Sequence, residues 1–279
     1  MHLYRTDRFP IVQSEGHWYQ IEKTWNELIL DDKLPATLRS AIESSQPDPS
    51  LADLQESALV PITDQEIWAA GVTYFRSKTA RMDESKDAGG GDFYDRVYDA
   101  DRPEIFFKAT AVRTVGHGQA MHLRDDSKWI VPEPELTLVV SPGGKVIGYT
   151  IGNDLSCRDI EGENPLYLPQ AKTFRACASI GPAIYVSDSP LDRETEICLS
   201  IKRGNEEIVS DKTTLSQMKR SLEELVGFLF SNNCHPNGCF LMTGTGIVPA
   251  DDFCLLSGDQ VSITIDPIGT LVNSMTKVA

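Results

Sequence analysis

Two glutamates flank a proline in the segment IVPEPELTLVV, residues 130–140. Proline is excluded from a helix interior, so Pro132 and Pro134 predict an extended backbone here, and their missing N–H groups favour an edge or rim of a sheet. Alternate residues of a strand share one face, which places Glu133 and Glu135 on the same side, about 6.6 Å apart. Such carboxylates repel each other unless a cation lies between them, and their oxygens suit a hard ion such as Mg²⁺. A pair of solvated glutamates on an exposed strand is the competing interpretation.

A third carboxylate follows one short connection later. The segment VIGYTIGNDLSCRD, residues 146–159, reads as a strand that runs into Asn153 and Asp154. The Pro-Gly-Gly turn within residues 141–145 predicts a hairpin, which would make this strand a neighbour of the Glu133 strand. Asp154 would then be the third ligand of a catalytic Mg²⁺ site with positions left open for water or substrate. Taken alone, Asn-Asp after a strand is an ordinary turn.

Two further segments suit an anionic substrate. Lys172 precedes an apolar stretch in AKTFRACASIGP and is expected to be partly buried, although a surface lysine is the simpler alternative. Thr245 lies in the turn MTGTG, residues 242–246, whose hydroxyls and amides could hold a carboxylate. The sequence contains no HExxH, GxSxG, Walker or GxGxxG pattern, which disfavours zinc hydrolases, serine hydrolases and nucleotide-binding enzymes.

The elements that must position these residues change in character along the chain. Residues 1–60 show helical apolar spacing at 25–30, 34–42 and 51–59, which predicts a small N-terminal α/β cap. From Ile67 onward short strand-like runs dominate, interrupted by one helix that a capping box at Ser221 and Glu224 introduces. This pattern predicts an α+β fold with a small domain at 1–60 and a β-rich catalytic domain at 61–279. Residues 76–102 are highly charged with a triple glycine at 89–91, and read either as a solvated loop or as a lid.

Composition limits the partners and the compartment. The 279 residues hold 41 acidic and 26 basic side chains, a net charge of −15, which argues against nucleic acid as a partner. The apolar runs are too short to cross a bilayer, so no membrane association is expected. The six cysteines form no CxxC pair, and with an N-terminus unlike a secretory signal they predict a reduced, cytoplasmic protein.

The ordered set of motifs resembles the fumarylacetoacetate hydrolase family. The resemblance covers residues 67 to 275 through AAGVTY (69–74), PEIFFKAT (103–110), EPEL (133–136), GYTIGNDLSCRD (148–159), AKTF (171–174), IGPAIYV (180–186), LEELVGFLF (222–230), TGTG (243–246) and SGDQVSITIDPIGTLVN (257–273). It implies a β-roll catalytic fold, a divalent metal held by Glu133, Glu135 and Asp154, and Lys172 beside that metal. It also implies Thr245 near the substrate carboxylate and a homodimer or homotetramer. Mn²⁺ and Ca²⁺ are alternatives to Mg²⁺.

One departure from the family pattern bears on the reaction. Hydrolytic members typically carry G-x-N-Y-x-x-H-x-x-E, whose His and Glu activate water, whereas this chain has Thr73 for the asparagine and Ser77 for the histidine. A serine has no accessible pKa for general-base work, so this route to hydrolysis is disfavoured. The TGTG turn likewise ends in Gly246 where many relatives have proline.

With these departures from the hydrolase pattern, the sequence is similar to the sugar-acid branch of the family, the 2-keto-3-deoxy-D-arabinonate dehydratases. The resemblance implies a Mg²⁺-dependent hydro-lyase that removes the C3 proton and the C4 hydroxyl of a 2-keto-3-deoxy sugar acid. Lys172 is the candidate base, or else an electrostatic partner of the enolate, and Glu104 the candidate acid or water-orienting group. Arg76, Ser77, Lys108 and Thr245 are candidate substrate contacts.

Two other functions compete with dehydration. The first is a hydrolase or decarboxylase of acylpyruvates or oxaloacetate, with water activated by Glu84 or Glu104. The second is a catalytically silent 2-keto acid binding protein that keeps the fold and the metal.

Overall fold

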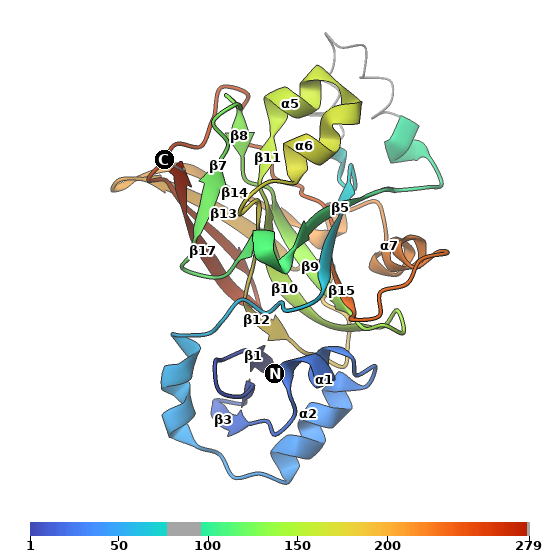
Figure 1. Cartoon of the computed structure of the whole chain (residues 1–279), viewed down its shortest axis with the longest axis vertical. Coiled ribbons are helices and arrows are strands. Elements are labelled where there is room, and N and C mark those ends of the chain that lie inside the picture. The colour runs from blue at the N-terminus through green and yellow to red at the C-terminus, as the bar shows by residue number, and fades with distance from the viewer. Residues whose placement is uncertain (77–95, 278–279) are drawn as a thin grey trace.

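The computed structural model describes residues 1–76 and 96–277 (Figure 1). Ser77, Glu84 and the triple glycine at 89–91 lie outside the described residues, so the predictions made for them stay predictions. The described chain folds into two large β-sheets with few helices, which agrees with the predicted α+β class. No helix among the described residues is both long enough and apolar enough to cross a membrane.

The larger sheet has ten strands and carries the acidic residues. In spatial order its strands are β3 (His17–Gln20), β2 (Ile11–Ser14), β1 (His2–Tyr4), β12 (Ala178–Tyr185), β10 (Val146–Asp154), β9 (Pro134–Val140), β15 (Cys239–Met242), β4 (Glu66–Gly71) and β5 (Glu104–Thr110), with β6 (Thr114–Val115) beside β12. The predicted hairpin is confirmed, because β9 and β10 pair antiparallel across the turn at residues 141–145.

The second sheet covers one face of the first. Its order is β14 (Glu206–Thr214), β13 (Glu196–Arg203), β16 (Gln260–Ile265), β17 (Gly269–Lys277) and β7 (Ala120–Leu123), and a two-stranded ribbon joins β8 (Ile130–Val131) to β11 (Ser156–Cys157). Alternate residues of both sheets are apolar and meet in one buried core, where Leu136 and Ile151 of the first sheet join Leu199 and Ile263 of the second.

The helices lie outside the sheets. They are α1 (Trp25–Ile29), α2 (Leu34–Glu43), α5 (Arg158–Glu163), α6 (Leu168–Lys172) and α7 (Leu222–Leu229), with 3₁₀ turns η1 (Pro49–Gln55), η2 (Ala111–Arg113), η3 (Pro165–Tyr167) and η4 (Leu215–Gln217). The helix predicted at 51–59 is instead the 3₁₀ turn η1. The predicted start of α7 is confirmed, because the Ser221 side chain accepts a hydrogen bond from the Glu224 N–H. The Glu224 carboxylate accepts from Arg220 Nη1.

The N-terminal segment is joined to the larger sheet by hydrogen bonds. Strand β1 pairs with β12, which places Leu3 opposite Ile184. Leu3 and Leu38 share a buried cluster with Val139 and Ile180 of the central strands. Figure 1 shows this blue segment at the end of the molecule away from α5 and α6. The domain boundary near residue 60 stays a prediction, and the two parts share one sheet and one core.

The predicted edge position of the Glu133 strand is wrong. Strand β9 lies between β10 and β15, and every residue of it is buried. Pro134 is the first residue of the strand, so its missing N–H does not remove a hydrogen bond from the interior of the sheet. Glu133, which precedes the strand, and Glu135 within it are both buried, which removes the alternative of a solvated surface pair.

Candidate active site

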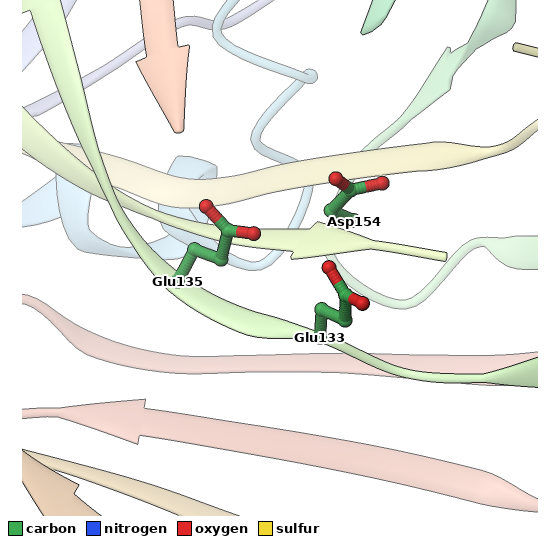
Figure 2. Close-up of side chains that lie close together, drawn as sticks. All are labelled: Glu133, Glu135 and Asp154. Atoms are coloured by element: carbon green, nitrogen blue, oxygen red, sulfur yellow. The ribbon is translucent and has the colours of Figure 1, made fainter. Parts of the chain in front are cut away.

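Three carboxylates meet where β9 begins and β10 ends. Glu133 precedes β9, Glu135 is its second residue and Asp154 is the last residue of β10. The antiparallel register pairs Glu135 with Gly152, and the Asp154 N–H donates to the Glu133 carbonyl at 3.0 Å. Figure 2 shows the three side chains turned toward one another. Each offers an oxygen within 4.8 Å of the others, and all three are buried.

The electrostatics of this cluster fit a divalent cation. Burial, and then the charges of Asp154 and Glu133, raise the pKa of Glu135 well above its ordinary value. Three carboxylates crowded into one buried volume do not all stay ionised without a compensating charge. An oxygen-only donor set is the set that Mg²⁺, Ca²⁺ and Mn²⁺ prefer. The chemistry of Glu133, Glu135 and Asp154 therefore suits the predicted metal.

Lys172 neutralises two of these carboxylates. It ends helix α6 and is fully buried, deeper than the sequence predicts. Its Nζ donates to Glu133 Oε2 at 2.7 Å, to Asp154 Oδ2 at 3.1 Å and to Ser156 Oγ at 2.5 Å. Burial alone would raise the pKa of Asp154, but Lys108 and Lys172 outweigh it and hold that pKa below its ordinary value. The prediction that Lys172 lies beside the metal ligands is consistent with this geometry.

Arg158 is a residue of the cluster that the sequence analysis did not select. It begins α5, is 2% exposed, and its Nη2 donates to Glu133 Oε1 at 2.9 Å. The signal was its place four residues after Asp154 in the motif GYTIGNDLSCRD. That spacing did not reveal the contact, because Arg158 is brought near Glu133 by the pairing of β11 with β8, which sets Ser156 opposite Val131.

A narrow pocket opens beside the cluster. It is lined by Ala70, Gly71, Val72, Phe106, Glu133, Asp154, Arg158, Lys172, Gly244 and Thr245. Val72 has a φ of 53°, a left-handed conformation that is unfavourable for a β-branched side chain. Strained backbone of this kind is concentrated at functional sites.

The TGTG turn forms one wall of this pocket. The Gly244 N–H donates to Glu135 Oε2 at 2.5 Å, and its φ is 95°. Thr73 donates from Oγ1 to the Thr243 carbonyl at 2.7 Å, so the residue that stands in place of asparagine secures the turn. Thr245 is 4% exposed and its Oγ1 donates to the Ile247 carbonyl. Its place in the wall agrees with its predicted role near a substrate carboxylate, which stays a prediction.

Glu104 lies at the side of the pocket. It opens β5 directly opposite Gly71, and a Cβ added to Gly71 would come within 2.0 Å of Glu104 Oε2. The glycine therefore provides the space that the carboxylate occupies. Gly71 lines the pocket and Glu104 does not, so Glu104 lies directly beside a residue of the pocket wall.

The structure does not bring two of the predicted substrate contacts to the pocket wall. Arg76 is half exposed and donates to Asp211 Oδ2 at 2.8 Å and to the Val248 carbonyl at 3.0 Å. Lys108 is fully buried behind the carboxylates and does not line the pocket. A direct contact of Lys108 with substrate would require its ammonium group to leave the protein acceptors that surround it.

Comparison with known proteins places this arrangement in a family. Residues 67–276 match the model of the fumarylacetoacetate (FAA) hydrolase C-terminal family. A probable 2-keto-3-deoxyxylonate dehydratase of Haloferax volcanii is 50% identical over 228 residues, which are 81% of this chain and 78% of that protein. The 2-dehydro-3-deoxy-D-arabinonate dehydratase of Saccharolobus solfataricus is 43% identical over 219 residues, 78% of this chain and 74% of that protein.

A solved structure shows the same fold over the whole chain. It is a 2-keto-3-deoxy-D-arabinonate dehydratase complexed with magnesium and 2,5-dioxopentanoate, with a TM-score of 0.84 and 34% identity. The alignment covers 100% of this chain and 99% of that one. The shared motifs, the matched model and the shared fold together show that the chain belongs to the fumarylacetoacetate hydrolase family.

Proposed function

We propose that this protein is a Mg²⁺-dependent hydro-lyase that dehydrates a 2-keto-3-deoxy sugar acid such as 2-keto-3-deoxy-D-arabinonate. The observation that carries the proposal is the buried cluster of Glu133, Glu135 and Asp154 with Lys172 bonded to two of them. Relatives at 50% and 43% identity that carry dehydratase names support the choice of reaction.

The charge balance of the site suits an anionic keto acid. Three carboxylates are offset by three cations, since Lys108 and Lys172 pair with Asp154 while Lys172 and Arg158 pair with Glu133. A divalent metal held by the carboxylates would supply Lewis-acid stabilisation of negative charge on the C1 carboxylate and C2 oxygen of a keto acid. The added charge of the metal would leave the site able to accept an anion. Thr245 lines the pocket, which supports its proposed contact with the substrate carboxylate.

Two residues of the chain then carry out the proton transfers of the dehydration. A divalent metal bound beside Lys172 would favour its neutral amine over the ammonium. In that neutral form Lys172 takes the proton from C3, and the electron pair of that C–H bond forms the C3=C4 double bond as the C4–O bond breaks. Glu104 gives its proton to the departing hydroxyl, so that water leaves. A proton shift from C5 to C3 then leaves a C4=C5 enol, and transfer of the enol O–H proton to C4 gives the C5 aldehyde, so the product is a 2,5-dioxo acid. That product class is the one bound in the similar solved structure.

The test is turnover of purified protein with Mg²⁺ and 2-keto-3-deoxy-D-arabinonate, followed by detection of an aldehyde-bearing 2-oxo acid. Glu135→Gln is expected to lose activity together with Mg²⁺ binding. Glu206→Gln, which changes an exposed strand glutamate, is the matched control and should behave as the unaltered protein. Unchanged substrate in the presence of folded, Mg²⁺-loaded protein would refute the proposal.

The competing hypothesis of a hydrolase is tested in the same turnover assay with other keto acids as substrates. Pyruvate release from an acylpyruvate would support it, and binding of pyruvate without turnover of any keto acid would support the silent binding protein. The position at which hydrolytic members carry the asparagine of their motif holds Thr73, whose hydroxyl donates to the Thr243 carbonyl.

We further propose a cytoplasmic homodimer or homotetramer. All six cysteines are free, which fits a reducing compartment. The assembly is the one that the family resemblance implies. Light scattering of the purified protein would give the number of subunits.

A further inference from the structure

Lys108 links two parts of the candidate active site through one ammonium group. Its Nζ lies 2.5 Å from Asp154 Oδ1, donates to the Leu155 carbonyl at 2.9 Å and donates to the Lys172 carbonyl at 2.5 Å. Asp154 is a proposed metal ligand, and Lys172 carries the proposed base. One side chain therefore holds the strand end that bears the ligand and the helix end that bears the base.

Lys108 lies at a β-bulge. In the β4–β5 pairing Ile67 lies opposite Ala109 and the next residue, Trp68, lies opposite Phe107. Lys108 is thus the extra residue of the bulge and has no partner in that register. Bulges are common next to functional sites, and Lys108 follows Glu104 and Phe106 at alternate positions of β5.

The main chain of Lys108 reinforces the same link. Thr173 donates from Oγ1 to the Lys108 carbonyl at 3.0 Å, so residues 172 and 173 are bonded to both ends of Lys108. The Phe174 ring centroid lies 5.7 Å from Lys108 Nζ, within cation–π range. Residues 172–174, at the end of α6 and directly after it, therefore each contact Lys108.

We propose that Lys108 is a positioning residue that keeps the Asp154 ligand and the Lys172 base in register with each other. The inference rests on the proposed function for the roles of those two residues and differs from the sequence-based expectation that Lys108 contacts substrate. A residue that acts through Asp154 and Lys172 affects turnover, whereas a direct substrate contact affects mainly substrate affinity.

The test is Lys108→Met, which keeps the length of the side chain and removes the three polar contacts of Nζ together with its cation–π contact. At saturating Mg²⁺ we expect kcat to fall by about 10- to 100-fold, as for other residues that orient a metal site, while KM stays within about 3-fold. Lys202→Met, an exposed lysine on β13, is the matched control. Unchanged kcat in folded Lys108→Met, or a rise in KM alone, would overturn the inference.

A second variant covers the case in which Lys108→Met does not fold. Thr173→Val removes only the hydroxyl that donates to the Lys108 carbonyl and changes no charge. It is expected to lower kcat by about 3- to 10-fold with unchanged KM and unchanged Mg²⁺ affinity, since orientation is lost without loss of a ligand. Full activity of both this variant and any folded Lys108→Met protein counts against the link.

A crystal structure of whichever of these two variants folds separates this inference from the proposed function. We expect Lys172 Nζ to move away from Glu133 Oε2, from which it now lies 2.7 Å. If the unaltered protein does not dehydrate the keto acid, the proposed function fails, and the displacement of Lys172 still decides the role of Lys108. An unmoved Lys172 refutes the role whether or not the enzyme is a dehydratase.

Discussion

Each of the three acidic residues is stabilised in a different way. Glu133 accepts from Arg158 and Lys172, and Asp154 is paired with Lys108 and Lys172. The Glu135 carboxylate accepts instead from the neutral Gly244 N–H. Its ionisation therefore depends most on a bound cation, in agreement with its raised pKa.

Magnesium stabilisation is expected to grow with pH. Burial and the neighbouring Asp154 and Glu133 raise the pKa of Glu135 well above 4.5, so the metal-free protein loses stability as pH rises from that value through the raised pKa. A divalent ion binds the ionised carboxylate and competes with its proton. The rise in Tm on adding Mg²⁺ should therefore increase across that pH window.

Thermal unfolding with and without Mg²⁺ at a series of pH values measures this effect. In Glu135→Gln the increase of the Mg²⁺ effect with pH should disappear, because the titrating group is gone. The control Glu206→Gln should keep the increase of the Mg²⁺ effect on Tm with pH. A Mg²⁺ effect on Tm that is independent of pH in the unaltered protein would contradict the assignment of Glu135 as a ligand.

Gly71→Ala is expected to disable Glu104 without changing its chemistry. The added methyl group would overlap Glu104 Oε2 and displace that carboxylate from the side of the pocket. We expect kcat to fall by about 100-fold or more, because a positioned proton-transfer group typically contributes about 10²- to 10⁴-fold, with Mg²⁺ affinity retained. Gly227→Ala is the matched control, since its Cβ would meet open space in α7. Equal kcat in Gly71→Ala and the unaltered protein would exclude Glu104 as the acid.

Burial should determine which cysteines of the protein react with a thiol reagent. Burial raises the pKa of Cys157 to about 11 and that of Cys239 to about 12, so neither forms an appreciable thiolate near neutral pH. Cys234 is exposed. With a thiol-specific reagent and mass spectrometry, Cys234 should be labelled well before Cys157 and Cys239. Comparable labelling of Cys157 would indicate that the ribbon β8–β11 opens in solution.

Among the elements, the turn after β15 couples folding to the metal site. Gly244 carries the N–H that reaches Glu135, and an added Cβ would lie 2.0 Å from Thr73 Oγ1 and 2.9 Å from the Ala70 carbonyl. With a φ of 95°, the position is also strained for any L side chain.

Gly244→Ala is therefore expected to destabilise the protein by about 1–3 kcal/mol and to weaken Mg²⁺ binding. Chemical denaturation measures the first effect and calorimetric Mg²⁺ titration the second. Gly227→Ala, in the helix α7, should instead stabilise the protein by about 0.5–1 kcal/mol. If Gly244→Ala lost stability but bound Mg²⁺ as before, the turn would have no part in holding Glu135.

For the whole molecule, the shared sheet predicts cooperative unfolding. Strand β1 pairs with β12, and the cluster that contains Leu3 and Leu38 also contains Val139 and Ile180. A fragment of residues 61–279 would expose this cluster. We expect that fragment to aggregate and the full chain to unfold in one calorimetric transition. Two separate transitions would show that residues 1–60 are an independent domain.

Local patterns along the chain were enough to propose the three carboxylate ligands, and the resemblance of the ordered motifs supplied the reaction class. Glu133 and Glu135 share a face because strand side chains alternate, and the Pro-Gly-Gly turn brings Asp154 to the neighbouring strand. These are relations between residues close in sequence or joined by one hairpin, which a pattern of residue types expresses directly. The ordered motifs then indicated the family, which the comparisons confirmed.

Contacts between distant segments were decided only by the tertiary structure. The bond from Lys108 to the Lys172 carbonyl joins residues 64 positions apart, and that from Arg158 to Glu133 spans 25. The central place of β9 depends on β15, which is far along the chain. Such contacts follow from how strands are ordered in the sheet and where a bulge falls, because strand pairing, and not local residue type, sets which side chains meet.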